Sequence, residues 1–320
     1  MTALTTLTSR REFLFCYDIK MGNPNGDPDE NRPRVLPDKT HYVTDVRLKR
    51  FVRDFFKLQG RQILVDKIEG QTTNLTGRVA AHLQSVGQTQ ANGAELVTIL
   101  LNSFIDARLF GSSFAFKKQE KWDLTAEPKT LTGAVQIMHG EVMHKAAEVD
   151  IVGTSVFGSD EEKRQGTFTT YYALRYALIG FNGVANEHSA RLSRMTDEDY
   201  TLLLRAMWDG VRAAANTRTK RGQVPRLLLS VVYRPGQEFQ FGNLIDYVKP
   251  LARTEKKPEE WSSPEDYTLD VSRLLERLTA QAARIARLEV CVSPDVVLSA
   301  PLTLPGVEVV NLNFDVPDVG

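Results

Sequence analysis

The sequence predicts an α+β fold in which a core of strands and helices is enlarged by long insertions. Segments with a two-residue apolar repeat alternate with segments whose apolar residues recur every three or four positions, and polar stretches separate them. At 320 residues the chain is longer than one small domain requires. Its composition, 42% hydrophobic and 25% charged, is typical of globular proteins and excludes a disordered chain.

The first predicted element is a strand over residues 11–20, followed by a long loop and a helix. Both faces of the strand are apolar, which is typical of burial on two sides. The loop over residues 21–43 contains four prolines and two glycines and is longer than a connection requires. Thr44 then caps a helix that ends near residue 57. Its apolar stripe consists of Leu48, Phe51, Val52, Phe55 and Phe56.

The same two periodicities predict the remaining elements. In chain order these are a strand at 61–65, an insertion at 66–93, a helix at 94–109, a strand at 132–144, a polar segment at 145–166, a strand at 168–180, a helix at 197–215, a strand at 226–234, a helix at 266–287, a strand at Leu288–Val292 and a proline-rich coil.

The cysteines and the absence of sorting motifs indicate a reducing cytoplasm. Cys16 and Cys291 form no CxxC pair and no Cys/His spacing of a metal site. Residues 1–11 lack an apolar signal core, and no run approaches the roughly 18 apolar residues of a membrane span, so no membrane contact is expected. Serine-hydrolase, phosphate-loop and zinc-protease motifs are absent as well. We therefore predict no catalytic residue, no metal and no cofactor.

The net charge is zero, which normally argues against a polyanionic ligand, but the charges are segregated. The 40 Lys and Arg residues balance 40 Asp and Glu residues. Residues 44–57 hold five bases and two acids, and residues 216–226 hold four bases and no acid. Residues 258–270 hold five acids and no base. A local basic strip can still bind phosphate groups, because salt screens charges over about 10 Å at ~0.1 M.

Three segments are candidates for phosphate contact, and each has a purely structural alternative. The Asn23–Asp29 loop forms either ordinary turns or a nest of backbone amides around an anion, and its spacing does not match a calcium-binding loop. The bases of residues 44–57 form either a solvated helix face or a phosphate-tracking surface. The 217–223 loop combines bases with Gly and hydroxyl groups, which suits phosphate binding or a charged surface loop. His139 and His144 fall on opposite strand faces, so we expect no shared metal.

Several motifs resemble one protein family. The run YDIKMGNPNGDPDENRPR at residues 17–34, followed by VTDVRLKR at 43–50, is similar to the backbone-forming subunit of type I CRISPR Cascade complexes. That subunit is a RAMP-superfamily protein, and the similarity is to its subtype I-B and I-C branch. The segments TGAVQI (132–137), ALIGFNG (177–183) and TRTKRGQ (217–223) extend the resemblance, which spans roughly residues 11–235.

The resemblance implies an RRM-like (ferredoxin-like) palm over residues 1–320, with a finger insertion at 66–130 and a β-hairpin thumb at 145–170. It implies a non-catalytic protein that polymerises with copies of itself along CRISPR guide RNA and grips the sugar–phosphate backbone. Each thumb would kink the guide, and the exposed bases would pair with a target DNA strand. Other Cascade subunits would complete the complex.

The resemblance also implies which residues contact RNA. The predicted RNA-binding residues are Asn23, Asn25, Gly26, Arg47, Lys49, Arg50, Arg53, Gln136, His139, His144, Arg218, Lys220 and Arg221. Val156 and Phe157 are candidate wedges at the kinked base, and the core of the hairpin is an equally suitable place for them.

Two other functions remain open on the sequence. An RNA-cleaving backbone subunit of a type III-like complex would use a loop aspartate, for which Asp27, Asp29 and Asp45 are the candidates. A stand-alone RNA-binding protein would need no complex at all. In a filament, the acidic segment 258–270 is expected to contact a basic face of the next copy, which would give a head-to-tail helix.

Overall fold

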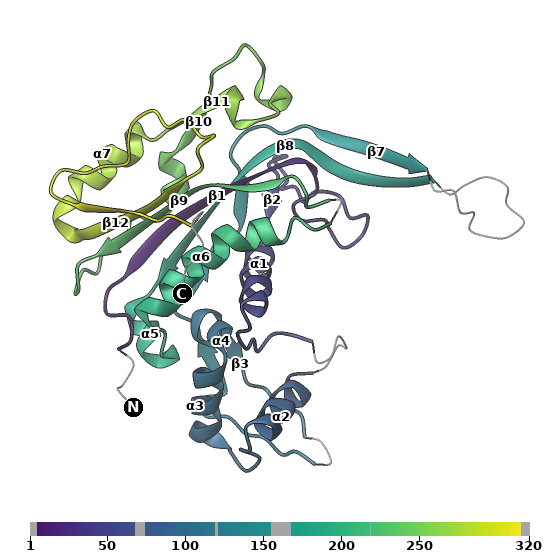
Figure 1. Ribbon diagram of the computed structural model, residues 1–320, viewed down its shortest axis with the longest axis vertical. Coiled ribbons are helices and arrows are strands. Elements are labelled where there is room, and N and C mark those ends of the chain that lie inside the picture. The colour runs from purple at the N-terminus through teal and green to yellow at the C-terminus, as the bar shows by residue number, and fades with distance from the viewer. Residues whose placement is uncertain (1–4, 68–73, 119–120, 155–167, 218, 315–320) are drawn as a thin grey trace, which may run out of the picture.

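The computed structural model describes residues 5–67, 74–118, 121–154, 168–217 and 219–314, and one large β-sheet forms its centre (Figure 1). Within these residues the sheet has nine strands: β1 (Arg11–Gly22), β2 (Tyr42–Val43), β5 (Val135–Ile137), β6 (Gly140–Val142), β7 (Glu148–Thr154), β8 (Phe168–Ala185), β9 (Gln223–Tyr233), β12 (Ile285–Val292) and β13 (Glu308–Asn311). Their order is β13-β12-β9-β1-β8-β6-β2, and β5 and β7 also pair with β8. The β12–β13 pair is parallel and the other pairs are antiparallel.

Strand β1 lies at the middle of the sheet, between β8 and β9, as its two apolar faces predict. Phe15 and Tyr17 belong to the core on one side of the sheet. Leu14 and Cys16 belong to the core on the other side. Every residue from Arg11 to Ile19 is buried, so the predicted doubly buried strand is confirmed.

Helices α1 (Asp45–Leu58) and α6 (Asp197–Ala213) cover the first of these faces, close to the two helices that the apolar stripes predict. They cross at Gly210, where an added Cβ atom would lie 2.7 Å from the carbonyl oxygen of Phe51. Glycine therefore allows the two backbones to approach closely. A capping box begins α6, because the Thr196 hydroxyl accepts the Asp199 amide and the Asp199 carboxylate accepts the Thr196 amide.

The second face carries the C-terminal elements, where the prediction was partly wrong. These are η1 (Leu244–Tyr247), β10 (Lys249–Ala252), η2 (Pro258–Glu260), η3 (Pro264–Asp266), β11 (Tyr267–Asp270), α7 (Ser272–Ala280) and η4 (Ala282–Arg284). The predicted helix at 266–287 is shorter, because Tyr267 and Leu269 alternate as buried strand residues that pair with β10. The expected terminal coil includes β13, which pairs with β12.

A separate lobe with its own hydrophobic core lies beyond α1 (Figure 1). It contains α2 (Leu75–Ser85), α3 (Gly93–Ser103), α4 (Ile105–Phe110), β3 (Gly111–Ser113) and β4 (Thr130–Thr132), and α5 (Glu187–Ser193) packs beside α4. The predicted strand at 61–65 is wrong, because the amides of Leu64 and Val65 bond to the Asp106 carboxylate rather than to a strand. The predicted helix at 94–109 breaks at Phe104, whose backbone is extended.

Strands β7 and β8 form a hairpin that projects from the sheet (Figure 1). Strand β8 pairs with β1 from Ala185 back to Leu174. From Ala173 to Phe168 it pairs only with β7, over the register Val149↔Ala173 to Thr154↔Phe168. The predicted strand at 132–144 is divided into β5 and β6, which both pair with β8.

Both cysteines are buried and unpaired. Among the described residues, none of the helices combines the length and the apolar character that crossing a membrane requires.

Candidate nucleic-acid interface

The loop after β1 is fastened to the start of α1 by Asn25. The Asn25 Oδ1 atom accepts hydrogen bonds from the Thr44 amide at 2.9 Å and from the Thr44 hydroxyl at 2.8 Å. Thr44 occupies the N-cap position, but its side chain bonds to Asn25 and makes no cap bond to the helix. Asn25 therefore fixes the position of the α1 N-terminus relative to the loop.

Gly26 and Asp27 give this loop turns rather than an anion-binding nest. No residue from Asn23 to Asp29 has a positive φ, which a nest of converging amides requires. The amides of residues 29, 30 and 31 converge instead on the Asp27 carboxylate, at 2.8 to 3.0 Å. An added Cβ atom at Gly26 would lie 1.8 Å from the Asn31 Oδ1 atom, so a larger residue would require the Asn31 side chain to move.

Four of the five bases on α1 already have acidic partners within the chain. Arg53 Nε donates to Asp106 at 2.9 Å, and the two side chains are only 12% and 1% exposed. The other three ion pairs are Lys49 with Asp45, Arg50 with Asp54, and Lys57 with Asp66. The helix is therefore much less positive toward a ligand than its sequence indicates.

Arg47 and Lys220 differ from these bases, because neither forms an ion pair with any described residue. The Lys220 ammonium group donates to the carbonyl oxygens of Asn23 and Pro24, the latter at 2.8 Å. Burial lowers the pKa of Lys220 to about 7, and the nearby Arg47 guanidinium lowers it as well. Burial also lowers the pKa of Arg47. Two neighbouring, half-buried cations that form no ion pair with a described residue make a site that an oxyanion would stabilise.

Buried polar atoms without partners surround these two cations. Neither the Tyr17 hydroxyl, nor Asn23 Oδ1, nor Arg47 Nε, nor the Gln223 side-chain amide has a hydrogen-bond partner. The fold brings them together, since Gln223 lies opposite Ile19 in the β1–β9 pair and the Asn23 amide donates to the Thr219 carbonyl. Leaving such groups unpaired costs free energy, and a bound phosphate group can accept from the donors among them.

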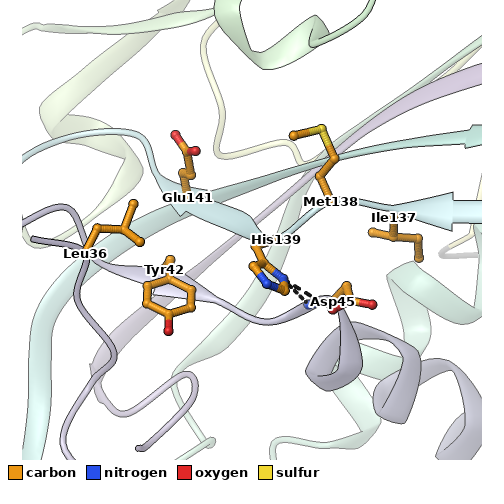
Figure 2. A pocket seen from close by; sticks show the side chains of 7 residues that line it. All are labelled: Leu36, Tyr42, Asp45, Ile137, Met138, His139 and Glu141. Carbon is orange, nitrogen blue, oxygen red and sulfur yellow. Dashed lines mark hydrogen bonds and ion pairs between the residues drawn. The ribbon is translucent and has the colours of Figure 1, made fainter.

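His139 lies at the N-terminus of α1, in a pocket of about 420 Å³ (Figure 2). Its Nδ1 atom accepts from the Asp45 amide at 3.3 Å and lies 3.2 Å from the Asp45 carboxylate. Burial acts to raise the pKa of Asp45, but the hydrogen bond from Lys49 and its positive charge hold it below its ordinary value. The exposed Gln136 side chain on β5 donates to the Gly133 carbonyl at 3.1 Å.

His144 makes structural contacts at the base of the hairpin. Its Nδ1 atom bonds to the Lys145 carbonyl at 3.0 Å, and its Nε2 atom accepts from the Leu178 amide at 3.2 Å. Its ring packs against Trp261, with ring centres 4.8 Å apart. Burial lowers the pKa of His144, which favours the neutral form that these two bonds require.

Two of the three loop aspartates that a cleaving subunit would need have partners of their own. Asp27 accepts three backbone amides, and the Asp45 carboxylate pairs with Lys49. In the part of the chain that the structure covers, no three His, Cys, Asp or Glu side chains gather as a metal site would require.

Comparison with known proteins decides the family. The family model described as CRISPR-associated protein Cas7 matches residues 9–272. A relative from Haloferax volcanii, also described as CRISPR-associated protein Cas7, is 31% identical over 302 residues, which cover 90% of this chain and 87% of the relative. The chain belongs to the Cas7 family. The family predicted from the sequence motifs is thereby confirmed.

A solved chain shares the fold of this Cas7-family member. It comes from a structure described as a CRISPR RNA-guided surveillance complex in a pre-nicking state. The TM-score is 0.54 at 12% identity, and the match covers 96% of this chain and 97% of the solved one. At this identity the similarity bears on the fold alone.

Some predicted site residues of this Cas7-family chain gather, and others do not. Asn23, Asn25, Arg47 and Lys220 meet at the junction of β1, α1 and the 217–223 loop. Arg221 is exposed beside them. Arg218, Val156 and Phe157 lie outside the described residues. The sequence did not predict Tyr17 and Gln223 as site residues. Tyr17 looks like one more apolar residue of a buried strand, and Gln223 looks like the polar first residue of another strand.

Proposed function

We propose that this chain is a non-catalytic scaffold subunit that binds CRISPR guide RNA and assembles with copies of itself along that RNA. Membership of the Cas7 family supports the proposal, as does the fold shared with a chain of an RNA-guided surveillance complex. The observation that carries it is the pair of half-buried cations Arg47 and Lys220, which form no ion pair with any described residue. A phosphate group of the RNA backbone supplies the missing anion.

The RRM-like palm that we propose is the β1–α1–β6–β8–α6–β9 unit. Its strand order, β9-β1-β8-β6, with two helices on one face, supports an RRM-like arrangement. We assign residues 66–130 to the finger, whose separate core supports that division, and residues 145–170 to the thumb, which contains the β7–β8 hairpin. In this assignment the palm holds RNA, and the two extensions reach neighbouring molecules.

The phosphate contact is centred on Arg47 and Lys220, with Arg221 beside them and Asn23, Asn25 and Gly26 shaping the loop; Arg218, outside the described residues, remains a proposed contact from the sequence. A contact to backbone phosphate carries no sequence information, which suits a protein that must accept any guide. Gln136 and His139 are exposed on the neighbouring strands and are proposed contacts to ribose or base. Lys49, Arg50 and Arg53 contribute indirectly, by holding α1 and its ion pairs in place.

The thumb, to which we assign Val156 and Phe157 from the sequence, is proposed to separate and kink successive guide segments. Bases between kinks would remain exposed and pair with a target DNA strand. Other subunits of the surveillance complex would then bind the ends of the filament. The acidic segment contributes less to contacts between copies than its sequence indicates, because Asp266 is buried against Lys256 and Glu259 contacts Lys145.

The nucleic acid that co-purifies with the chain tests this function. We expect RNA of one uniform length, carrying a repeat-derived end, with nuclease-protected segments of constant spacing. The Arg47→Gln, Lys220→Gln double variant should lose this RNA, whereas Lys118→Gln, at an 80% exposed side chain of the separate lobe, should retain it. A chain that purifies without RNA, and binds none when RNA is added, would overturn the proposal.

A further inference from the structure

Glu148, at the start of β7, is held between two residues of the loop that follows β1. Its Oε1 atom lies 2.9 Å from His41 Nε2, and its Oε2 atom lies 4.0 Å from Arg32 Nη1. The Arg32 guanidinium also lies 3.7 Å above the centre of the Tyr172 ring on β8. Tyr172 pairs with Asp150, so it shares one face of the hairpin with Glu148. The loop thus contacts both strands of the hairpin.

The other end of the same loop forms part of the phosphate site. Lys220 donates to the carbonyl oxygens of Asn23 and Pro24, and Asn25 accepts from Thr44 at the start of α1. Between the two ends the loop is internally braced. Asp27 accepts three amides, and the Asp27 amide donates to the Arg32 carbonyl at 2.8 Å. A braced loop transmits a displacement from one end to the other better than a mobile loop does.

The hairpin needs such contacts, because its outer part has no other neighbour in the sheet. From Ala173 to Phe168, strand β8 pairs with β7 alone among the described strands. A two-stranded hairpin without further packing is only marginally stable, so its direction depends on contacts at its base. Near the base of the hairpin, His144 packs on Trp261 and Lys145 contacts Glu259 at 3.4 Å. The C-terminal segment therefore also contacts the start of the hairpin.

We propose that Glu148, through Arg32 and His41, is a positioning residue that fixes the direction of the β7–β8 hairpin relative to the Arg47–Lys220 site. The consequence for RNA rests on the proposed function. If one end of this braced loop holds a phosphate group and the other orients the hairpin, the spacing between that phosphate group and the described strands β7 and β8 is constant in every copy. Glu148 thereby contributes to the regular step of the assembly along the guide.

Distance measurement between two spin labels tests the positioning without RNA. Labels at Val46→Cys on α1 and Val152→Cys on β7 occupy side chains that are 65% and 62% exposed, and both native cysteines are buried. We expect a narrow distance distribution that broadens about twofold in the Arg32→Ala, Glu148→Ala background, as for an arm that loses the contacts at its base. The Glu276→Ala background, which removes an exposed carboxylate on α7, should leave the width unchanged.

Nuclease protection on a single long RNA tests the consequence. The Arg32→Ala, Glu148→Ala variant should keep its RNA affinity and its melting temperature but give a ladder of irregular steps. A sharp ladder together with an unchanged label distribution would overturn the inference and leave the proposed function intact. If the unmodified chain binds no RNA, the proposed function fails, and the label distribution alone still decides the positioning role.

Discussion

The ammonium group of Lys220 and the guanidinium group of Arg47 lie close together in the folded chain, and neither forms an ion pair with any residue that the structure describes. Burial and this neighbouring charge lower the pKa of Lys220 to about 7. The other four bases of α1 differ from Arg47, because each has a carboxylate partner. They are Lys49, Arg50, Arg53 and Lys57. Positive charge available to a ligand is therefore concentrated at one point rather than spread along the helix.

The lowered pKa predicts that RNA binding depends on pH. In the free chain Lys220 is about half protonated near pH 7. A bound phosphate group stabilises the protonated form and raises this pKa, so binding takes up a proton. Affinity per site should fall up to roughly tenfold as the pH rises from about 6 to about 8. Fluorescence anisotropy across this range measures the effect. The Lys220→Arg variant stays charged and should lose the dependence, and an identical slope in both proteins would contradict the account.

Asn25→Ala should destabilise the junction between the loop and α1. The substitution removes the acceptor for the Thr44 amide and hydroxyl. We expect the free energy of unfolding to fall by about 1 kcal/mol, the usual contribution of such a bond. Urea denaturation measures it. Asn25→Asp retains an acceptor and serves as the control, so equal losses in the two variants would show that the contact is unimportant.

Arg53→Ala should lower the stability of the fold but leave the salt dependence of RNA binding unchanged. The substitution leaves Asp106, which is 1% exposed, without its cation, although the amides of Leu64 and Val65 still bond to it. We expect a loss of roughly 3 kcal/mol in the free energy of unfolding. The slope of RNA affinity against salt should not change at a temperature where the variant is folded. A shallower slope would instead place Arg53 in contact with RNA.

Periodicity was sufficient to predict the long strands of the central sheet and the two helices on one of its faces, but not the strands β2, β7 and β13. Strand β1 and helices α1 and α6 follow from apolar residues at regular intervals. The separate lobe was harder, because polar residues occupy buried positions there. Thr76 and His82 are buried on α2, and His82 bonds to Ser103 on α3 at 2.8 Å. Satisfied polar groups of this kind interrupt an apolar stripe without preventing burial.

The candidate site was predictable in location but not in detail. The motifs indicate the loop after β1, the start of α1 and the 217–223 loop, and the structure brings these three segments together. The sequence could not distinguish Arg47 from Lys49 or Arg50, because the direction of each side chain decides whether it reaches an acidic partner. The partner of Arg53 is a residue of a distant helix. Nor could it show that Tyr17 and Gln223 are buried without hydrogen-bond partners.

The salt dependence of RNA affinity tests the central claim most directly. The unmodified chain is compared with the Arg47→Gln, Lys220→Gln variant and with a Lys49→Gln, Arg50→Gln variant that removes two internally paired bases of α1. If the first pair together grips one phosphate group, the slope of log affinity against log salt should fall by about 0.7 per copy. The second variant should change the slope much less. Equal slopes for the unmodified chain and the Arg47→Gln, Lys220→Gln variant would contradict the claim.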